Sequence, residues 1–315
     1  MSQEKIGFQE DVYGFLGCEM RVQSNSRDIL KFLQSVYARF YKGNESKNDD
    51  CSHGHVDEDK LIKIIDALSS SNEIIIKSIF GEDHMRCKSL YEFEDDYYAT
   101  VPDPLAFIQW IVLKNVSLLA KDYQLIHAGA VSLGDSCAIF PAFSGFGKTT
   151  LTLQLIQNGF KFLSDEIACI RSDTAFVEPF HRKLNLNDES RRLLGLGLLP
   201  EGSKRNIGSG EAEWTLDIED IVPSSLSPPC VLRYIIFLLG FGEKPRLERI
   251  AVSNALFNLF RFSFSSIDNR AKLLYDFAPV IDRAGCYNLV MGDPSETADL
   301  ISGLFQENQD AIMGL

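Results

Sequence analysis

The sequence predicts an α/β protein in which a nucleotide-binding core follows a smaller α+β region. Two observations predict this class. From Leu125 onward, strand patterns lead through a glycine-rich loop ending in Lys-Thr into a helix and then another strand. The residues before this point mix helical and β-branched segments. We therefore expect two domains, residues 1–122 and residues 123–315.

The first domain is predicted to contain two helices and short β-rich runs. Residues 27–41 place apolar side chains on one helical face, with Asn25 or Ser26 available as the N-cap. A run at 73–79 is rich in isoleucine and predicts a strand, and a second helix is expected from Pro104 to about residue 120. Residues 1–122 are thus predicted to be an α+β region, for which substrate recognition is our hypothesis.

The second domain alternates strands and helices. We predict strands at residues 137–140, 162–166, 231–239 and 286–291, and helices at 150–158 and 254–260. Ser172-Asp173 is typical of a hairpin turn, and Gly292-Asp293-Pro294 is typical of the start of a final helix.

Composition narrows the classes of partner and compartment. The formal net charge of −13 opposes binding to nucleic acid or to anionic lipid. The N-terminus lacks a signal-peptide pattern, and the longest apolar run, residues 234–241, is too short to span a bilayer. The 7 cysteines form no CxxC pair, which is typical of reduced thiols. We expect a cytoplasmic protein that binds neither nucleic acid nor membrane.

Residues 142–149 read Ala-Phe-Ser-Gly-Phe-Gly-Lys-Thr and match the phosphate-loop pattern GxxxxGK[ST], except that Ala142 replaces the first glycine. In this motif backbone N–H groups and the lysine bind phosphate oxygens, and the hydroxyl binds magnesium (Mg²⁺). The alternatives are a glycine turn that resembles the motif and a nucleotide site that no longer catalyses. The residues predicted to bind ATP are Ser144, Gly145, Phe146, Gly147, Lys148, Thr149 and Thr150.

Two adjacent acids follow the predicted helix. Asp165 and Glu166 end the run Phe-Leu-Ser-Asp-Glu, and acids at the carboxyl end of a strand lie where open α/β sheets bind their ligands. Beside a triphosphate they make Mg²⁺ the expected metal. The alternative for Glu166 is an ordinary solvated acid.

A further cation is expected to stabilise the charge that develops on the transferred phosphoryl group. The candidates are Arg182, Lys183, Lys204 and Arg205, of which we favour Arg182 and Arg205. The last two candidates lie in a glycine-bearing stretch, residues 202–210, with the composition of a mobile lid. Any of them could instead be a solvated surface charge.

The segment from His127 to Ile170 resembles the catalytic core of HPr serine kinase/phosphorylase and of the HPr-kinase-related kinases. The runs that carry the resemblance are "IHAGAV", "FSGFGKTTL" and "NGFKFLSDEIACI". The "LSDE" run, in place of two aspartates, is closer to the related group, which includes kinases of lasso-peptide biosynthesis. The resemblance implies a phosphate-loop core of the HPr kinase/PEP carboxykinase-like type. Residues 1–120 do not resemble the regulatory domain of HPr kinase.

Residue roles follow from the same resemblance. It implies that Asp165 accepts the proton of a substrate hydroxyl, that Glu166 helps to hold the metal, and that His127 lies near the phosphates or the acid, while the motif itself makes the Thr149 hydroxyl a metal ligand. A histidine in a strand is also often structural. The resemblance further suggests a homo-oligomer. The family's phosphorolysis motif is not recognisable, so reverse chemistry is not expected.

The function predicted from these residues is transfer of the γ-phosphoryl group of ATP to a hydroxyl, most simply a serine, of a peptide or protein. A second hypothesis is a small-molecule kinase with the same core. A third is a nucleotide-binding regulatory module without fast catalysis. Both acids together favour an enzyme over a passive module.

Overall fold

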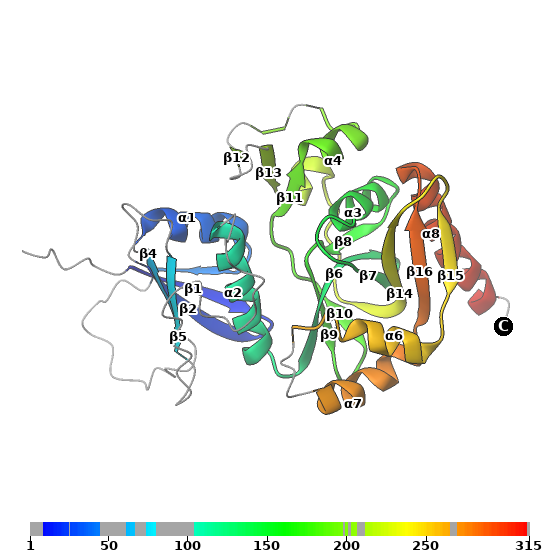
Figure 1. Ribbon diagram of the computed structural model, residues 1–315, viewed down its shortest axis with the longest axis horizontal. Helices are drawn as coiled ribbons and strands as arrows, with labels where there is room; N and C mark the ends of the chain where they lie inside the picture. Colours follow the sequence, from blue (N-terminus) through cyan, green and yellow to red (C-terminus); the bar gives the residue numbers. More distant parts are fainter. Residues whose placement is uncertain are drawn as a thin grey trace, which may run out of the picture. The chain divides into compact units, whose positions relative to one another are not determined.

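The structure is a computed structural model, and its sheets and helices form two compact units, Met1–Ala120 and Lys121–Leu315 (Figure 1). The residues it describes are 9–24, 26–44, 61–66, 74–79, 104–197, 199–200, 203–206, 212–264 and 270–313. In these residues no helix is both long and apolar enough to cross a lipid bilayer.

The first unit is built on a 5-stranded sheet of order β3-β1-β2-β4-β5. Its strands are β1 (Gln9–Phe15), β2 (Cys18–Ser24), β3 (Tyr41–Gly43), β4 (Leu61–Asp66) and β5 (Ile74–Ile79), and its helices are α1 (Arg27–Val36) and α2 (Pro104–Leu119). The predicted strand at 73–79 and helix from Pro104 are confirmed. Ser26 caps α1 as expected, but the helix ends at Val36 because Tyr37 leaves the helical conformation.

The second unit is built on an 8-stranded mixed sheet of order β10-β9-β6-β7-β14-β16-β15, with β8 paired to β6. Its strands are β6 (Tyr123–Leu133), β7 (Ser136–Pro141), β8 (Lys161–Ser164), β9 (Ile167–Arg171), β10 (Phe176–Glu178), β14 (Cys230–Phe241), β15 (Arg246–Arg249) and β16 (Gly285–Met291). The fold is therefore a mixed α/β fold with a large mixed sheet, and the hairpin turn predicted at 172–173 is confirmed by the β9–β10 pairing.

Helices cover both faces of this sheet (Figure 1). They are α3 (Lys148–Gln157) and α8 (Pro294–Met313) with one hydrophobic core, and α6 (Val252–Leu259) and α7 (Arg270–Ile281) with the other. Strand β7 serves both cores, because Phe140 faces α3 while Ile139 faces the opposite cluster. Such double burial explains why β7 reads as a continuous apolar run.

A separate 3-stranded sheet of order β11-β13-β12 lies in the same unit. It consists of β11 (Leu184–Asn187), β12 (Lys204–Asn206) and β13 (Ala212–Leu216), with the short helices α4 (Asp188–Leu193) and α5 (Ile218–Ile221). In the stretch predicted as a mobile lid, residues 204–206 form a strand that pairs with β13, and the role of the stretch as a lid stays a prediction. The rest of 202–210, apart from Ser203, lies outside the described residues.

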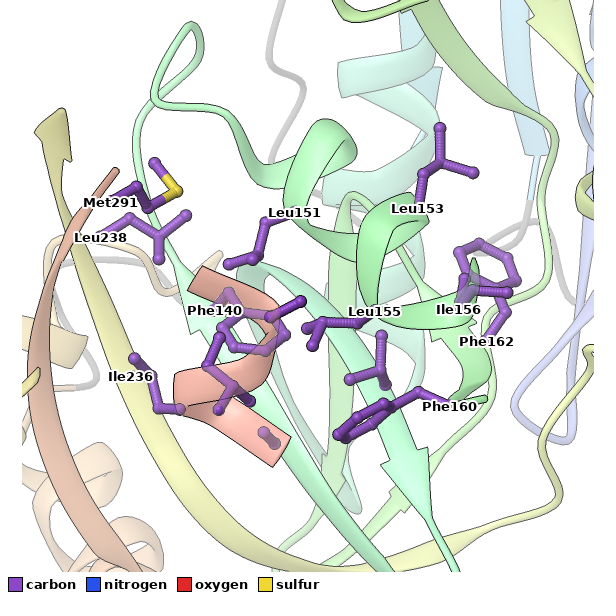
Figure 2. Close-up of a cluster of buried hydrophobic side chains, with 14 of the residues drawn as sticks. Phe140, Leu151, Leu153, Leu155, Ile156, Phe160, Phe162, Ile236, Leu238 and Met291 are labelled. Carbon is purple, nitrogen blue, oxygen red and sulfur yellow. The ribbon is translucent and has the colours of Figure 1, made fainter. Parts of the chain in front are cut away.

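Packing of α3 against the sheet fixes the position of its first turn. Figure 2 shows Leu151 and Leu155 of α3 beside Phe140 and Ile236 of the sheet. Each such buried side chain contributes about 1.5–3 kcal/mol. At Gly129 of β6 the helix lies so close that a Cβ atom there would be 2.7 Å from Thr152 Oγ1. The start of α3 is therefore held tightly against β6.

Candidate active site

The loop from Ala142 to Thr149, the glycine loop, joins the carboxyl end of β7 to α3. Gly147 is the N-cap of α3, with φ +80°, a left-handed conformation that favours glycine, and no side chain caps the helix there. Ser144 and Gly145 are exposed. The first-turn N–H groups of α3 thus lack the side-chain acceptor that usually covers a helix start, which is the arrangement that suits an anion.

Lys148, the first residue of α3, turns its side chain back beneath the loop. Its exposed fraction is only 7 %. The Nζ atom donates to Ala142 O at 2.8 Å and Phe143 O at 3.1 Å, and it lies 3.0 Å from His127 Nε2. Burial lowers the pKa of this ammonium group, while the negative charge of Glu166 acts in the opposite direction.

His127 of β6 connects Lys148 to Glu166. Its Nδ1 lies 3.1 Å from Glu166 O and 3.2 Å from Glu166 Oε1. Burial lowers the pKa of His127, so the ring is neutral near pH 7. Since an ammonium group can only donate, Nε2 accepts from Lys148, and Nδ1 carries the proton and donates to Glu166. The histidine therefore sets the orientation of both neighbours.

The two acids lie in a bend between β8 and β9, which corrects the prediction of one strand through Glu166. Ser164 Oγ causes the bend by accepting from Glu166 N at 3.3 Å and from Ile167 N at 3.0 Å. Strand β8 runs antiparallel to β6, and β6 runs antiparallel to β7, so β8 and β7 point in the same direction. The acids that follow β8 therefore lie at the same edge of the sheet as the glycine loop that follows β7.

Asp165 is the more deeply buried of these two acids, at 2 % exposure. Its Oδ1 has no hydrogen-bond partner within the described part of the chain, and the nearest cation is Arg182 Nη2 at 3.7 Å. Burial outweighs that cation and raises the pKa of Asp165 to about 6. A buried carboxylate oxygen without a partner is costly, which makes it a marker of a binding or catalytic position.

Arg182 lies between the two acids. Its Nη2 donates to Glu166 Oε2 at 3.0 Å, and the side chain is 5 % exposed. The segment that carries it is anchored by Phe180 N, which donates to Leu163 O at 2.9 Å. Burial alone would raise the pKa of Glu166, but the positive charge of Arg182, together with His127 and Lys148, lowers it. Glu166 is therefore an anion at neutral pH.

The five side chains form one cluster, which we call the polar cluster: His127, Lys148, Asp165, Glu166 and Arg182. Two cations beside an uncapped helix start suit a polyanion such as a triphosphate. The described residues contain no group of three or more His, Cys, Asp or Glu that could hold a metal by itself. Mg²⁺ is usually held by one or two carboxylates together with phosphate oxygens, and the two acids fit that mode.

The other residues predicted for the site lie in different surroundings. Thr149 is half-buried in the first turn of α3, whereas the Thr150 hydroxyl lies 2.6 Å from Ser190 Oγ. Arg205 belongs to β12, and in the strand register it lies opposite Glu213 of β13. Of the two favoured arginines, Arg182 contacts both acids, and a place for Arg205 in the site stays a prediction.

Sequence reasoning missed the hydrogen bonds that join this cluster. Nothing in the motif indicates that His127 contacts both Lys148 and Glu166, or that Arg182 binds Glu166. The signal that could have found the first contact is strand register. Ala128 pairs with Pro141, so the residue before Ala128 must lie beside the start of the glycine loop.

Comparisons with known proteins give likenesses among solved structures alone. No protein-family model matches the chain. No curated protein matches it either. Among solved structures, the HPr(Ser) kinase/phosphatase from Coxiella burnetii aligns over 61% of this chain and 93% of its own, with 14% identity and a TM-score of 0.28. At that TM-score the chemistry has to be derived from the polar cluster itself, and the HPr kinase-like core stays a prediction.

Proposed function

We propose that this chain is a magnesium-dependent kinase that transfers the γ-phosphoryl group of ATP to a hydroxyl group of a peptide or protein. The observation that carries the proposal is the buried Oδ1 of Asp165, which has no hydrogen-bond partner among the described residues and lies close to Arg182 and to the start of α3. Phosphoryl transfer needs these parts together, namely a base for the hydroxyl, cations for the phosphate and N–H groups that bind oxygen.

The glycine loop is proposed to bind the phosphates. Backbone N–H groups of residues 144–150 would donate to phosphate oxygens, and Lys148 would exchange its bonds to Ala142 O and Phe143 O for bonds to the β- and γ-phosphates. His127 keeps the ammonium group directed at the loop during this exchange, because its Nε2 remains an acceptor within the same reach.

Magnesium is proposed to be held by the Thr149 hydroxyl and Glu166. Bound there it would supply positive charge that offsets the charge on the phosphates. The lowered pKa of Glu166 keeps that carboxylate ionised and ready to bind a cation. Arg182, which contacts both acids, would also stabilise the equatorial oxygens of the group in transfer.

Asp165 is proposed as the general base. Its Oδ1 takes the proton of the acceptor hydroxyl while the hydroxyl oxygen bonds to the γ-phosphorus. The bond from that phosphorus to the bridging oxygen breaks, and its electron pair stays on ADP. A base with a pKa of about 6 is ionised at neutral pH and still basic enough to share a proton in the transition state.

The test is to incubate the purified protein with Mg²⁺, ATP labelled in the γ-phosphate and an extract of its own cells. We expect label on one peptide or protein, and at least a hundredfold less label with Lys148→Ala. Lys161→Ala is the matched control, because Lys161 is exposed and its Nζ donates to Ser224 O, outside the polar cluster. Label on a metabolite would favour a small-molecule kinase, and ATP binding with no transfer would favour a regulatory module.

A further inference from the structure

Strand β14 ends in an exposed aromatic side chain. Phe241, its last residue, is 69 % exposed. The pairing of β14 with β16 shifts between Leu238 and Gly240, so Leu239 is an extra residue that forms a β-bulge. Bulges redirect the strand that follows them and often occur beside functional sites. Here the bulge brings Phe241 into register with Met291 at the end of β16.

The ring of Phe241 contacts the glycine loop. A Cβ atom at Gly147 would lie 3.0 Å from Phe241 Cζ and 3.1 Å from Met291 Cε. The phenyl group is therefore in van der Waals range of the N-cap of α3, on the same loop in which Lys148 is buried. A large apolar ring that remains exposed at such a position gains nothing from the hydrophobic core.

The topology places this ring where α/β sheets bind ligands. Strands β7, β14 and β16 are parallel neighbours, and the glycine loop and Phe241 both lie at their carboxyl ends. In open α/β sheets the ligand crevice lies outside these ends. A nucleotide with its phosphates on the loop then has its base within the same crevice.

A second exposed ring on the loop is already packed. The ring centroid of Phe143 lies 4.9 Å from that of Phe262, and the Arg261 guanidinium carbon lies 5.1 Å from the centre of the Phe143 ring. In the described residues Phe241 has no such aromatic or cationic neighbour. Its faces are therefore better suited to stacking against a planar ligand.

We propose that the phenyl ring of Phe241 stacks against the base of the nucleotide and so determines that a nucleoside triphosphate, not a bare polyphosphate, binds the glycine loop. This inference rests on the proposed nucleotide function. Stacking on one aromatic ring tolerates any base, so it provides affinity without choosing between adenine and guanine.

The test compares ATP with inorganic tripolyphosphate, which has the phosphates and no base. We expect Phe241→Ala to weaken ATP binding about tenfold and to leave tripolyphosphate binding within about twofold, as measured by calorimetry with Mg²⁺. Phe257→Ala is the matched control, because Phe257 is 71 % exposed on α6 and should change neither affinity. An equal loss for both ligands, or no loss for either, would overturn the inference.

A second variant reports on stacking directly. The tryptophan fluorescence of Phe241→Trp should be quenched by ATP and not by tripolyphosphate, beyond the response of the wild-type chain with its 2 tryptophans. The two proposals fail differently. If Lys148→Ala leaves the binding of both ligands unchanged, or if the wild-type protein binds neither, the nucleotide function and the stacking are both contradicted. If the wild-type protein binds ATP and tripolyphosphate with equal affinity, only the proposed role of Phe241 is contradicted.

Discussion

Among the described residues, each unit of the molecule buries one aspartate, and the surroundings of the two differ. Asp11 in β1 accepts from Gln34 Nε2 at 2.8 Å, from Tyr13 OH at 3.3 Å and from Tyr41 OH at 3.4 Å. Burial raises its pKa, and the hydrogen bonds that favour the carboxylate are all from uncharged donors. Asp165 instead lies beside Arg182, with Oδ1 left without a partner in the described residues.

The difference separates a carboxylate that holds a fold together from one that fits the chemistry we propose. Three donors tie Asp11 to β1, α1 and β3, so its bonds are complete within the protein. Asp165 bears the cost of burial without that compensation, a cost that a protein retains where the group has a function. A raised pKa alone does not distinguish the two aspartates, whereas the count of satisfied oxygens does.

The largest expected effect is on phosphoryl transfer. Asp165→Asn should reduce the rate of transfer by about 10²–10⁴-fold, because the amide cannot accept the hydroxyl proton. ATP affinity should change by less than about threefold, and Asp11→Asn should leave transfer intact. Single-turnover rates and nucleotide titrations of the three proteins measure both quantities. Undiminished transfer by Asp165→Asn would remove the base from the mechanism.

The next effect is the pH dependence of transfer. Since Asp165 must be ionised to act as a base and its pKa is raised to about 6, kcat/KM should fall as pH drops through 6. The expected slope is about tenfold per pH unit below that point, and it should vanish in the residual activity of Asp165→Asn. A wild-type profile that stays flat down to pH 5 would contradict this assignment.

The smallest effect is on stability, and its sign should differ between the two aspartates. The pKa of folded Asp165, about 6, exceeds the ordinary value of 3.8, so ionisation costs stability above pH 6 and the cost disappears below about pH 4. Asp165→Asn should therefore raise the free energy of unfolding by about 1–3 kcal/mol at pH 8 and not at pH 4.

Asp11→Ala provides the opposite half of that comparison. It leaves the side-chain donors of Gln34, Tyr13 and Tyr41 without their acceptor and should lower the free energy of unfolding by about 1–3 kcal/mol. Urea unfolding of both variants, fitted with a common m-value, measures the two shifts. If both variants lower the free energy of unfolding at pH 8, Oδ1 of Asp165 has a hydrogen-bond partner in solution.

In the second unit, a helix or strand could be predicted from the sequence where a local pattern of residues determines it. Strand β7 and helix α3 follow from an apolar run, a glycine loop and helical periodicity, all within residues 136–157. The bend at Ser164 was missed because a hydroxyl that accepts two backbone N–H groups looks, in sequence, like any strand serine. Strand β12 was missed because three residues are too few to show the alternation of apolar and polar side chains that indicates a strand.

The polar cluster was predictable in membership but not in its bonds. Lys148, Asp165 and His127 were identified from motif and resemblance, and Arg182 was one of four candidate cations. Which cation meets the acids depends on how the chain between β10 and β11 is anchored at Leu163, a long-range contact without a local pattern. The neutral state of His127 likewise depends on burial that only the folded sheet creates.

The contact between β6 and α3 has a consequence for how far this chain can vary. At Gly129 a single methyl group would meet Thr152 Oγ1 at 2.7 Å, with Lys148 Cβ only 3.9 Å away. Alanine there carries no charge and takes no part in the chemistry, yet it would push the helix that begins with the lysine. A related chain with a larger residue at this position could thus keep the phosphate-loop motif in its sequence and still lose the close packing of α3 on β6 that positions the lysine.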